Sequence, residues 1–224
     1  MKRHIAAISI AAVSLVLGLV CGIALKPTPL HINADSPNKT PLLERVPDVQ
    51  QSTNFSCGAA ALQAVLGYWG IRTQEQTLME ALHTNEMSGT SPESIIRVAR
   101  EMGLDAYARE NLDIKALEEA VPRIPVICAI QAWPNSHEAK FTWNKCWEEG
   151  HYVIVIGIDK QNVYVEDPSL FGTRGFIPRE EFLERWHDYE GDPPLDKSDR
   201  IDFHLGIFIA AKTIAEQPLF TRVE

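Results

Sequence analysis

The most constraining feature of this sequence is a segment that reads as a helix with apolar residues on nearly every side. Residues 57–69 run Cys-Gly-Ala-Ala-Ala-Leu-Gln-Ala-Val-Leu-Gly-Tyr-Trp, and Gly70 follows. Alanine and leucine are strong helix formers, and a glycine directly after them favours the end of the helix. A helix without a polar face is stable only where other elements cover it. The sequence therefore predicts a buried helix at the centre of the fold.

A cysteine begins this helix, directly after a polar stretch that starts at Gln51. Asn54 and Ser56 are residue types that cap helices, and we expect them to cap this one. A thiol in the first turn lies near unpaired N–H groups and the positive end of the helix dipole, and both favour the thiolate. Gln51 offers an amide that can donate to a developing oxyanion. This stretch alone leaves two interpretations of Cys57 open, a nucleophile or a small core residue.

The periodicity of the sequence changes from helical to extended about halfway along the chain. Ser91 before Pro92 indicates a helix start, and Thr73–Gln76 has the form of a capping box. Later apolar runs read as buried strands. This order predicts an α+β fold, with helices first and then a mostly antiparallel sheet. The predicted helices are 57–69, 73–82, 91–102, 111–120 and 178–186, and the predicted strands are 104–108, 124–132, 151–159, 163–166 and 203–210.

The N-terminal segment 1–25 differs from the rest of the chain. Lys2, Arg3 and His4 precede 21 uncharged residues, 5–25, close to the ~20 that span a bilayer. The basic start places the N-terminus inside and the following domain outside. Small residues ending at Ala24 also allow cleavage of a signal peptide. Two outcomes stay open, a membrane anchor or a cleaved signal, and both predict an extracytoplasmic domain.

The remaining boundaries follow from composition. Residues 26–45 are rich in proline and polar residues and read as a linker. Residues 46–212 have the pattern of one packed domain, and residues 213–224 read as a tail.

Charge and cysteine usage exclude several classes of protein. Beyond residue 25 the chain has 19 basic and 30 acidic residues and no basic run, which argues against a nucleic-acid partner. The four cysteines are scattered, without the spacing of a disulfide framework or a zinc site. No motif indicates a cofactor, and we expect the protein to act without one. No feature fixes an oligomeric state.

A predicted hairpin supplies the groups that an activated thiol needs. His151 begins one strand, and Asp167 ends the partner strand after a three-residue turn. Residues at the open end of a hairpin lie side by side, so the imidazole and the carboxylate can meet. The carboxylate would orient the imidazole, whose other nitrogen would face Cys57 as general base.

The spacing of these residues is similar to that of a known family. Gln51 lies six residues before the Cys-Gly-Ala-Ala sequence that begins at Cys57, Gly-His-Tyr-Val includes His151, and Asp167 precedes a proline. Over about residues 46–190 the chain resembles the papain-like peptidases that cut bacteriocin precursors after double-glycine leaders, and more closely their stand-alone relatives. The resemblance implies a papain-like fold with the cysteine on the central helix. It also implies Cys57 as nucleophile, His151 as general base and acid, Asp167 as orienting group and Gln51 as oxyanion donor.

The chain departs from the transporter-linked members of that family. Those members join the peptidase to a membrane domain and an ATPase, whereas this sequence has one long apolar segment and no Gly-x-x-x-x-Gly-Lys-[Ser/Thr] loop. We therefore do not extend ATP-driven export or a double-glycine substrate to this chain. The expected partner is a peptide or protein substrate.

Several competing residues have simpler interpretations. Asp159 is the nearest alternative to Asp167 but lies at the far end of its strand from His151, and Gln50 competes with Gln51 less well on spacing. Cys128 reads as a core residue, and Cys146 as a free thiol or a partner of Cys128. Three tryptophans near the long loop before His151 either line a substrate groove or cover the edge of the core; they are Trp133, Trp143 and Trp147.

These residues together predict a cysteine peptidase that works through an acyl-enzyme. Two alternatives remain. One is a non-catalytic peptide-binding domain on the same fold, and the other is an acyl transferase that uses an amine in place of water. A binding groove has no need of the thiol, which favours the enzyme.

Overall fold

The computed structural model describes residues 42–134 and 142–211. Its main element is a six-stranded antiparallel sheet with the strand order β1-β8-β2-β3-β4-β5, and β6 and β7 form a separate two-stranded sheet. The strands are β1 (Asp105–Arg109), β2 (Val126–Gln131), β3 (Gly150–Ile158), β4 (Asn162–Glu166), β5 (Gly175–Pro178), β6 (His187–Glu190), β7 (Arg200–Phe203) and β8 (Gly206–Ala210). The helices are α1 (Cys57–Tyr68), α2 (Glu75–Leu82), α3 (Pro92–Glu101), α4 (Ile114–Ala120) and α5 (Arg179–Arg185), with one 3-10 turn, η1 (Trp143–Lys145).

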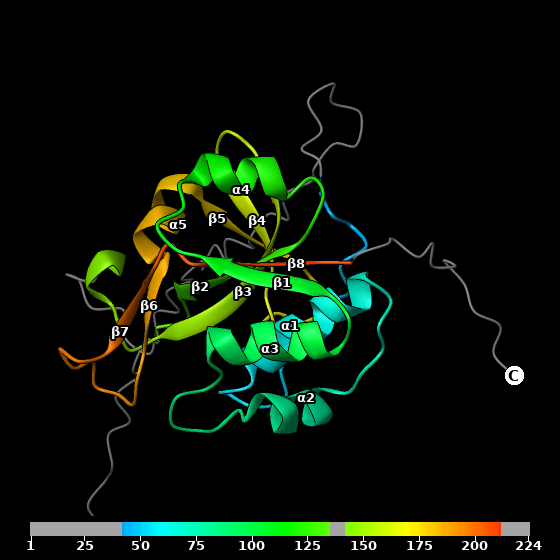
Figure 1. Cartoon of the computed structure of the whole chain (residues 1–224). Coiled ribbons are helices and arrows are strands. Elements are labelled where there is room, and N and C mark those ends of the chain that lie inside the picture. The colour runs from blue at the N-terminus through cyan, green and yellow to red at the C-terminus, as the bar shows by residue number, and fades with distance from the viewer. Residues whose placement is uncertain (1–41, 135–141, 212–224) are drawn as a thin grey trace, which may run out of the picture. The chain divides into compact units, whose positions relative to one another are not determined.

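Helices cover both faces of the six-stranded sheet (Figure 1). Alternate residues of a strand point to opposite faces, so Ile154 packs towards α1–α3 while Val153 and Val155 pack towards α4 and α5. Antiparallel sheets often leave one face in water, and their strands then alternate between apolar and polar residues. Here both faces are buried, which explains why β2 and β3 are almost continuously apolar.

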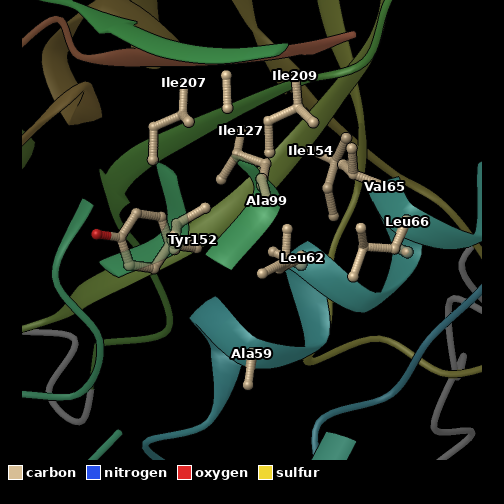
Figure 2. Packing of buried hydrophobic residues seen from close by; sticks show 14 of the residues in the cluster. Ala59, Leu62, Val65, Leu66, Ala99, Ile127, Tyr152, Ile154, Ile207 and Ile209 are labelled. Carbon is tan, nitrogen blue, oxygen red and sulfur yellow. The ribbon is translucent and has the colours of Figure 1, made fainter. Parts of the chain in front are cut away.

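The first helix occupies the centre of the larger core, as its composition predicts. Its residues from Gly58 to Leu66 are fully buried except for Gln63. Figure 2 shows the α1 side chains Leu62 and Val65 meeting isoleucines of β2, β3 and β8. Helices α2 and α3 pack on α1 as well. The predicted α+β fold, with the cysteine at the start of the central helix, is confirmed.

Some predicted elements are wrong in detail. The predicted strand 203–210 is two strands, because the chain turns at His204, where φ is +50°. Residues 200–203 pair with β6, and residues 206–210 pair with β1 and β2. The short strands β5 and β6 were not predicted, and α4 begins at Ile114 rather than at residue 111.

Two of the predicted helix caps are also wrong. Ser56 occupies the N-cap position of α1, but no side chain caps this helix, and neither Asn54 nor Ser56 does so. The residue at the N-cap of α2 is Gln74, also without a side-chain cap, so Thr73–Gln76 is not a capping box. The predicted cap of α3 is confirmed, because Ser91 Oγ accepts a hydrogen bond from the Ser94 N–H.

The predicted N-terminal anchor or signal (1–25) and the tail (213–224) lie outside the described residues, as does most of the linker. In the part that the structure describes, none of the helices has the length and hydropathy needed to span a membrane.

Candidate active site

A short hydrogen bond joins His151 to Asp167. His151 is the second residue of β3, and Asp167 directly follows β4, its antiparallel neighbour. His151 Nε2 lies 2.6 Å from Asp167 Oδ1, and both side chains are more than 90% buried. The open end of the hairpin therefore brings the imidazole and the carboxylate together as predicted.

The carboxylate of Asp167 is held by two further donors. The Ser169 N–H donates to Oδ1 at 2.8 Å, and the indole Nε1–H of Trp133 donates to Oδ2 at 3.1 Å. Trp133 has φ of +58°, in the left-handed region that non-glycine residues rarely adopt. Such backbone strain persists only where the surrounding structure supports it. The hydrogen bond to Asp167 gives Trp133 a role that the sequence analysis did not find.

Burial and two neighbouring groups, Asp167 and Cys57, determine the charge of His151. Burial by itself lowers the pKa of the imidazole, but hydrogen bonds and charge from Asp167 and Cys57 outweigh burial and raise it to about 10. Burial raises the pKa of Asp167, but its hydrogen bond with His151 and the charge of the imidazole lower the pKa below its usual value. The ring is therefore an imidazolium at neutral pH, with the carboxylate on one nitrogen and the thiol on its other side.

Cys57 is the first residue of α1 and is only partly buried. Ser56, just before it, uses its hydroxyl on the backbone of Thr53, where it accepts from the N–H at 3.1 Å. The first-turn N–H groups of α1 consequently receive no side-chain cap. They remain available to an acceptor that approaches Cys57.

Gly58 allows a close approach beside the thiol. A Cβ atom at this position would lie 2.8 Å from Thr90 Cβ and 3.2 Å from the Tyr152 ring. Tyr152 donates from its hydroxyl to the Thr90 carbonyl oxygen at 3.0 Å. Since Tyr152 follows His151 in β3, this contact fixes the start of α1 next to the start of β3.

The side chain of Gln51 lies on the Asp167 side of the site. Its backbone N–H donates to the Pro168 carbonyl oxygen at 2.9 Å, and its Oε1 accepts from Ser169 Oγ at 3.3 Å. Its Nε2 donates to the Thr53 carbonyl oxygen at 2.7 Å, which uses one of the two amide protons. Gln51 does not line the cleft described next.

Cys57 and His151 open into a cleft of about 600 Å³. Its sides come from the loop between α2 and α3, from Trp147 before β3 and Gly150 at the start of β3, and from the β6–β7 hairpin. A cleft of this size that exposes a thiol beside a histidine can hold several residues of a peptide.

The competing residues have structural partners. Asp159 accepts hydrogen bonds from the turn N–H groups of Gln161 and Asn162, so it is a turn residue. Cys128 is fully buried, burial raises its pKa, and both Cys128 and Cys146 are free thiols.

Within residues 42–134 and 142–211, no group of His, Cys, Asp and Glu side chains is placed to hold a metal ion.

The three tryptophans differ in their roles. Trp147 lines the cleft, which agrees with one of the two predictions for these residues. Trp143 lies under the Arg185 guanidinium, 3.6 Å from the ring centroid. Trp133 and Trp143 line a second, more apolar hollow together with Asp167.

Comparison with known proteins identifies the domain. The model of the Peptidase C39 family matches residues 45–190. A transport/processing ATP-binding protein, ComA of Streptococcus pneumoniae, is 29% identical over 136 residues, which are 61% of this chain and 17% of that protein. The chain therefore spans less than a fifth of that relative. The predicted resemblance to the double-glycine peptidases is confirmed at the level of the family.

Solved structures show the same fold. A C39-like peptidase from Bacillus anthracis aligns with a TM-score of 0.59 at 19% identity and covers 79% of this chain and 100% of its own. A cysteine protease from Carica candamarcensis, in complex with E-64, aligns with a TM-score of 0.50 at 13% identity and covers 75% of this chain and 95% of its own. The fold is that of the papain-like cysteine peptidases. The catalytic roles of Gln51, Cys57, His151 and Asp167 remain predictions.

Titration of His151 tests the electrostatics of the site. We expect NMR of the selectively ¹⁵N-labelled imidazoles to find His151 protonated at pH 8, with a midpoint near the pKa of about 10. Asp167→Asn removes the larger of the two contributions that raise the pKa of His151, while burial still lowers it. The midpoint should therefore fall by at least ~2 pH units. Trp133→Phe, which removes only a hydrogen bond to Asp167, should lower the midpoint less. Trp143→Phe is the control and should leave the midpoint unchanged.

The same shift predicts a pH dependence of stability. The folded pKa of His151 lies above its usual value of 6.5, so its stabilising effect is complete below pH 6.5 and is lost as the pH rises towards 10. The difference in melting temperature between wild type and Asp167→Asn should therefore shrink over that range. A neutral His151 at pH 7 in the wild-type protein would contradict this description.

Proposed function

The chain belongs to the Peptidase C39 family, and from this premise we propose that it hydrolyses peptide bonds with a Cys57–His151–Asp167 triad. The observation that carries the proposal is the buried 2.6 Å hydrogen bond between His151 and Asp167 at the cleft where Cys57 begins its helix. An imidazolium held by a carboxylate stabilises a neighbouring thiolate, which is the nucleophilic form of cysteine.

The proposed reaction proceeds through an acyl-enzyme. The thiolate of Cys57 attacks the carbonyl carbon of the substrate, and a C–S bond forms as negative charge develops on the oxygen. The uncapped N–H groups at the start of α1, among them that of Cys57, lie where they can donate to this oxygen. His151 then protonates the leaving amine as the C–N bond breaks, and afterwards accepts a proton from the water that hydrolyses the thioester.

Gln51 is proposed as a second oxyanion donor. Its Nε2 uses one proton on the Thr53 carbonyl oxygen and has a second proton. Since the side chain does not line the cleft in this structure, its amide has to turn towards Cys57 to donate to the substrate. The backbone contact between Gln51 and Pro168 couples its position to that of Asp167. Asp167 itself takes no proton in this mechanism and orients the imidazole.

Cleavage of internally quenched peptides tests the function. We expect the wild-type protein to hydrolyse members of a mixed-sequence set. Cys57→Ala and His151→Ala should each lower the rate by at least ~1,000-fold, because members of such a triad act as a unit. Gln51→Ala should lower it by ~100-fold, as for the loss of one oxyanion donor. Cys146→Ala is the matched control, a thiol outside the triad, and should be fully active. Binding without cleavage by the wild-type protein would support the non-catalytic alternative instead.

We also propose that the domain acts outside the cytoplasm. The 21 uncharged residues after Lys2, Arg3 and His4 support this, because such a segment either anchors a following domain or directs its export. A fusion of residues 1–45 to alkaline phosphatase, which is active only after export, should be active, and a fusion of residues 26–45 should not. Recovery of the fusion with the membrane or in the soluble fraction would distinguish anchor from cleaved signal. An inactive 1–45 fusion would overturn this proposal.

A further inference from the structure

One face of the β6–β7 hairpin carries only charged side chains. Asp188 pairs with Asp202 and Glu190 pairs with Arg200 in the antiparallel register. Since alternate residues share a face, these four side chains lie on one side of the hairpin. Like charges directly opposite each other destabilise a strand pair. The Asp188–Asp202 pair therefore needs a reason other than the stability of the hairpin.

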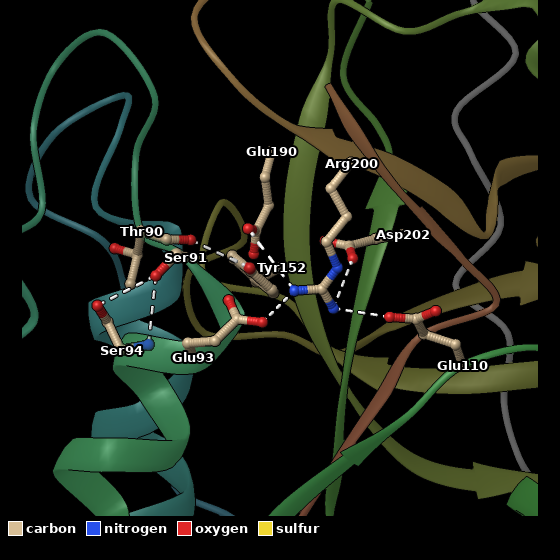
Figure 3. A network of polar contacts seen from close by, with 9 residues as sticks. All are labelled: Thr90, Ser91, Glu93, Ser94, Glu110, Tyr152, Glu190, Arg200 and Asp202. Atoms are coloured by element: carbon tan, nitrogen blue, oxygen red, sulfur yellow. Dashed lines mark hydrogen bonds and ion pairs between the residues drawn. The ribbon is translucent and has the colours of Figure 1, made fainter. Parts of the chain in front are cut away.

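Arg200 is the cation of this face, and carboxylates outnumber it. Figure 3 shows its guanidinium among four of them. It contacts Glu93 of α3, lies 2.7 Å from Glu110, 3.3 Å from Asp202 and 3.7 Å from Glu190. These ion pairs attach the hairpin to α3 and to the segment after β1. They also leave an excess of negative charge on the cleft side.

The charged face lies beside the candidate triad. A Cβ atom at Gly150 would be 2.6 Å from Asp188 Oδ2, so this carboxylate packs against the residue before His151. Asp188, Glu190 and Asp202 all line the cleft that contains Cys57. Of the described residues that line it, six are acidic and none is Lys or Arg. The remaining three acidic residues are Glu86, Glu148 and Asp192.

Two buried carboxylate oxygens in this face lack a hydrogen-bond donor. Asp202 is 2% exposed, and its buried Oδ1 accepts no hydrogen bond, although Arg200 lies 3.3 Å away. Glu190 Oε1 is buried without a donor as well. Asp188 is half-buried, and its Oδ1 accepts from Gln131 Nε2 at 3.2 Å and from the Tyr189 N–H at 3.0 Å. A buried carboxylate oxygen without a hydrogen-bond donor is costly. A cationic ligand in the cleft would supply a donor to Glu190 Oε1 and to Asp202 Oδ1, which has only the ion pair with Arg200.

The raised pKa values of these carboxyl groups agree with a cationic ligand in the cleft. Burial, with the charge of Asp202, raises the pKa of Asp188 to about 7. Burial and neighbouring Glu93 raise the pKa of Glu190 to about 8. A cation that enters the cleft would relieve the repulsion and favour the ionised forms. The described carboxylates do not have an arrangement that holds a metal ion, so an organic cation fits the cleft better.

We propose that Asp188, Glu190 and Asp202 bind a positively charged side chain of the peptide substrate, close to the bond that Cys57 attacks. The substrate class is therefore a peptide or protein with Lys or Arg near the scissile bond. This inference rests on the proposed peptidase function and adds the specificity of the same cleft.

Paired substrates that differ only in charge test the proposal. Internally quenched hexapeptides carry Arg, citrulline, Lys, norleucine or Glu at each position in turn, with neutral mixtures elsewhere. Citrulline has the shape of Arg without its charge. For at least one position, we expect kcat/KM to be about tenfold higher for Arg than for citrulline, and lowest for Glu. The preference should weaken as NaCl is raised to 0.5 M, because salt screens the charges.

Variants locate the preference on the hairpin. Asp188→Asn retains the oxygen that accepts from Gln131 and Tyr189. It should reduce the ratio of kcat/KM for the Arg substrate to kcat/KM for the citrulline substrate to about threefold or less. Glu190→Gln provides a second, independent variant, and melting temperatures check that both fold. The matched control is Glu119→Gln, an exposed acid on α4 across the sheet, which should leave the ratio unchanged.

Binding to Cys57→Ala separates the two proposals. The same Arg and citrulline peptides are titrated against this variant and followed by fluorescence anisotropy. Arg-dependent binding without cleavage by the wild-type protein would overturn the peptidase function and support the cationic subsite. If the wild-type protein cleaves the peptides, and if kcat/KM and affinity are equal for Arg and citrulline at every position, the cationic subsite is overturned while the peptidase function stands. Neither cleavage nor Arg-dependent binding would overturn both.

Discussion

The burial of helix α1 is the constraint on which the rest of this structure depends. Its apolar residues need cover on all sides, and the sheet supplies it on one side and helices α2 and α3 on the others. Because α1 packs on β3, its first residue lies beside the first residues of that strand. The contact of Gly58 with Thr90 and Tyr152 holds this approach close. Hydrophobic packing thus brings Cys57 to His151, and no direct bond between them is required to do so.

The hairpin from β3 to β4 provides the second half of the arrangement. It returns the chain to the same end of the sheet, where Asp167 meets His151. Ser169 and Trp133 then fix the carboxylate from two directions. The imidazolium that results is stabilised from both sides, which explains how a buried histidine keeps its charge. The site therefore combines a nonpolar scaffold with a His151–Asp167 pair whose carboxylate is hydrogen-bonded on both oxygens.

Sequence reasoning predicted the parts of this structure that depend on local patterns. The apolar composition of residues 57–69 and the run after His151 correctly indicated a buried helix and a buried strand. The hydrogen bond between His151 and Asp167 followed from the geometry of a hairpin, although the two residues are 16 positions apart in the chain. The spacing of Gln51, Cys57, His151 and Asp167 indicated the family.

Features that depend on distant contacts were not predictable in this way. Strands β6 and β7 have four residues each, so the alternation of charged residues with Tyr189, Ile201 and Phe203 is too short to distinguish them from loops. Their charged face exists only because Asp188 and Asp202 pair across the hairpin. Trp133, which donates a hydrogen bond to Asp167, has a positive φ angle. A tryptophan in the sequence does not predict this backbone conformation. Ser56 has the right identity for a helix cap, but its hydroxyl bonds to Thr53 instead.

The central claim is that His151 and Asp167 activate the thiol of Cys57 alone. Alkylation of the wild-type protein by iodoacetamide at pH 7, followed by mass-spectrometric mapping, tests it directly because Cys128 and Cys146 serve as internal references. The account predicts that Cys57 reacts at least ~10 times faster than either, and that Asp167→Asn and His151→Ala remove most of this difference. Equal rates for Cys57 and Cys146, or a Cys57 rate unaffected by His151→Ala, would contradict it.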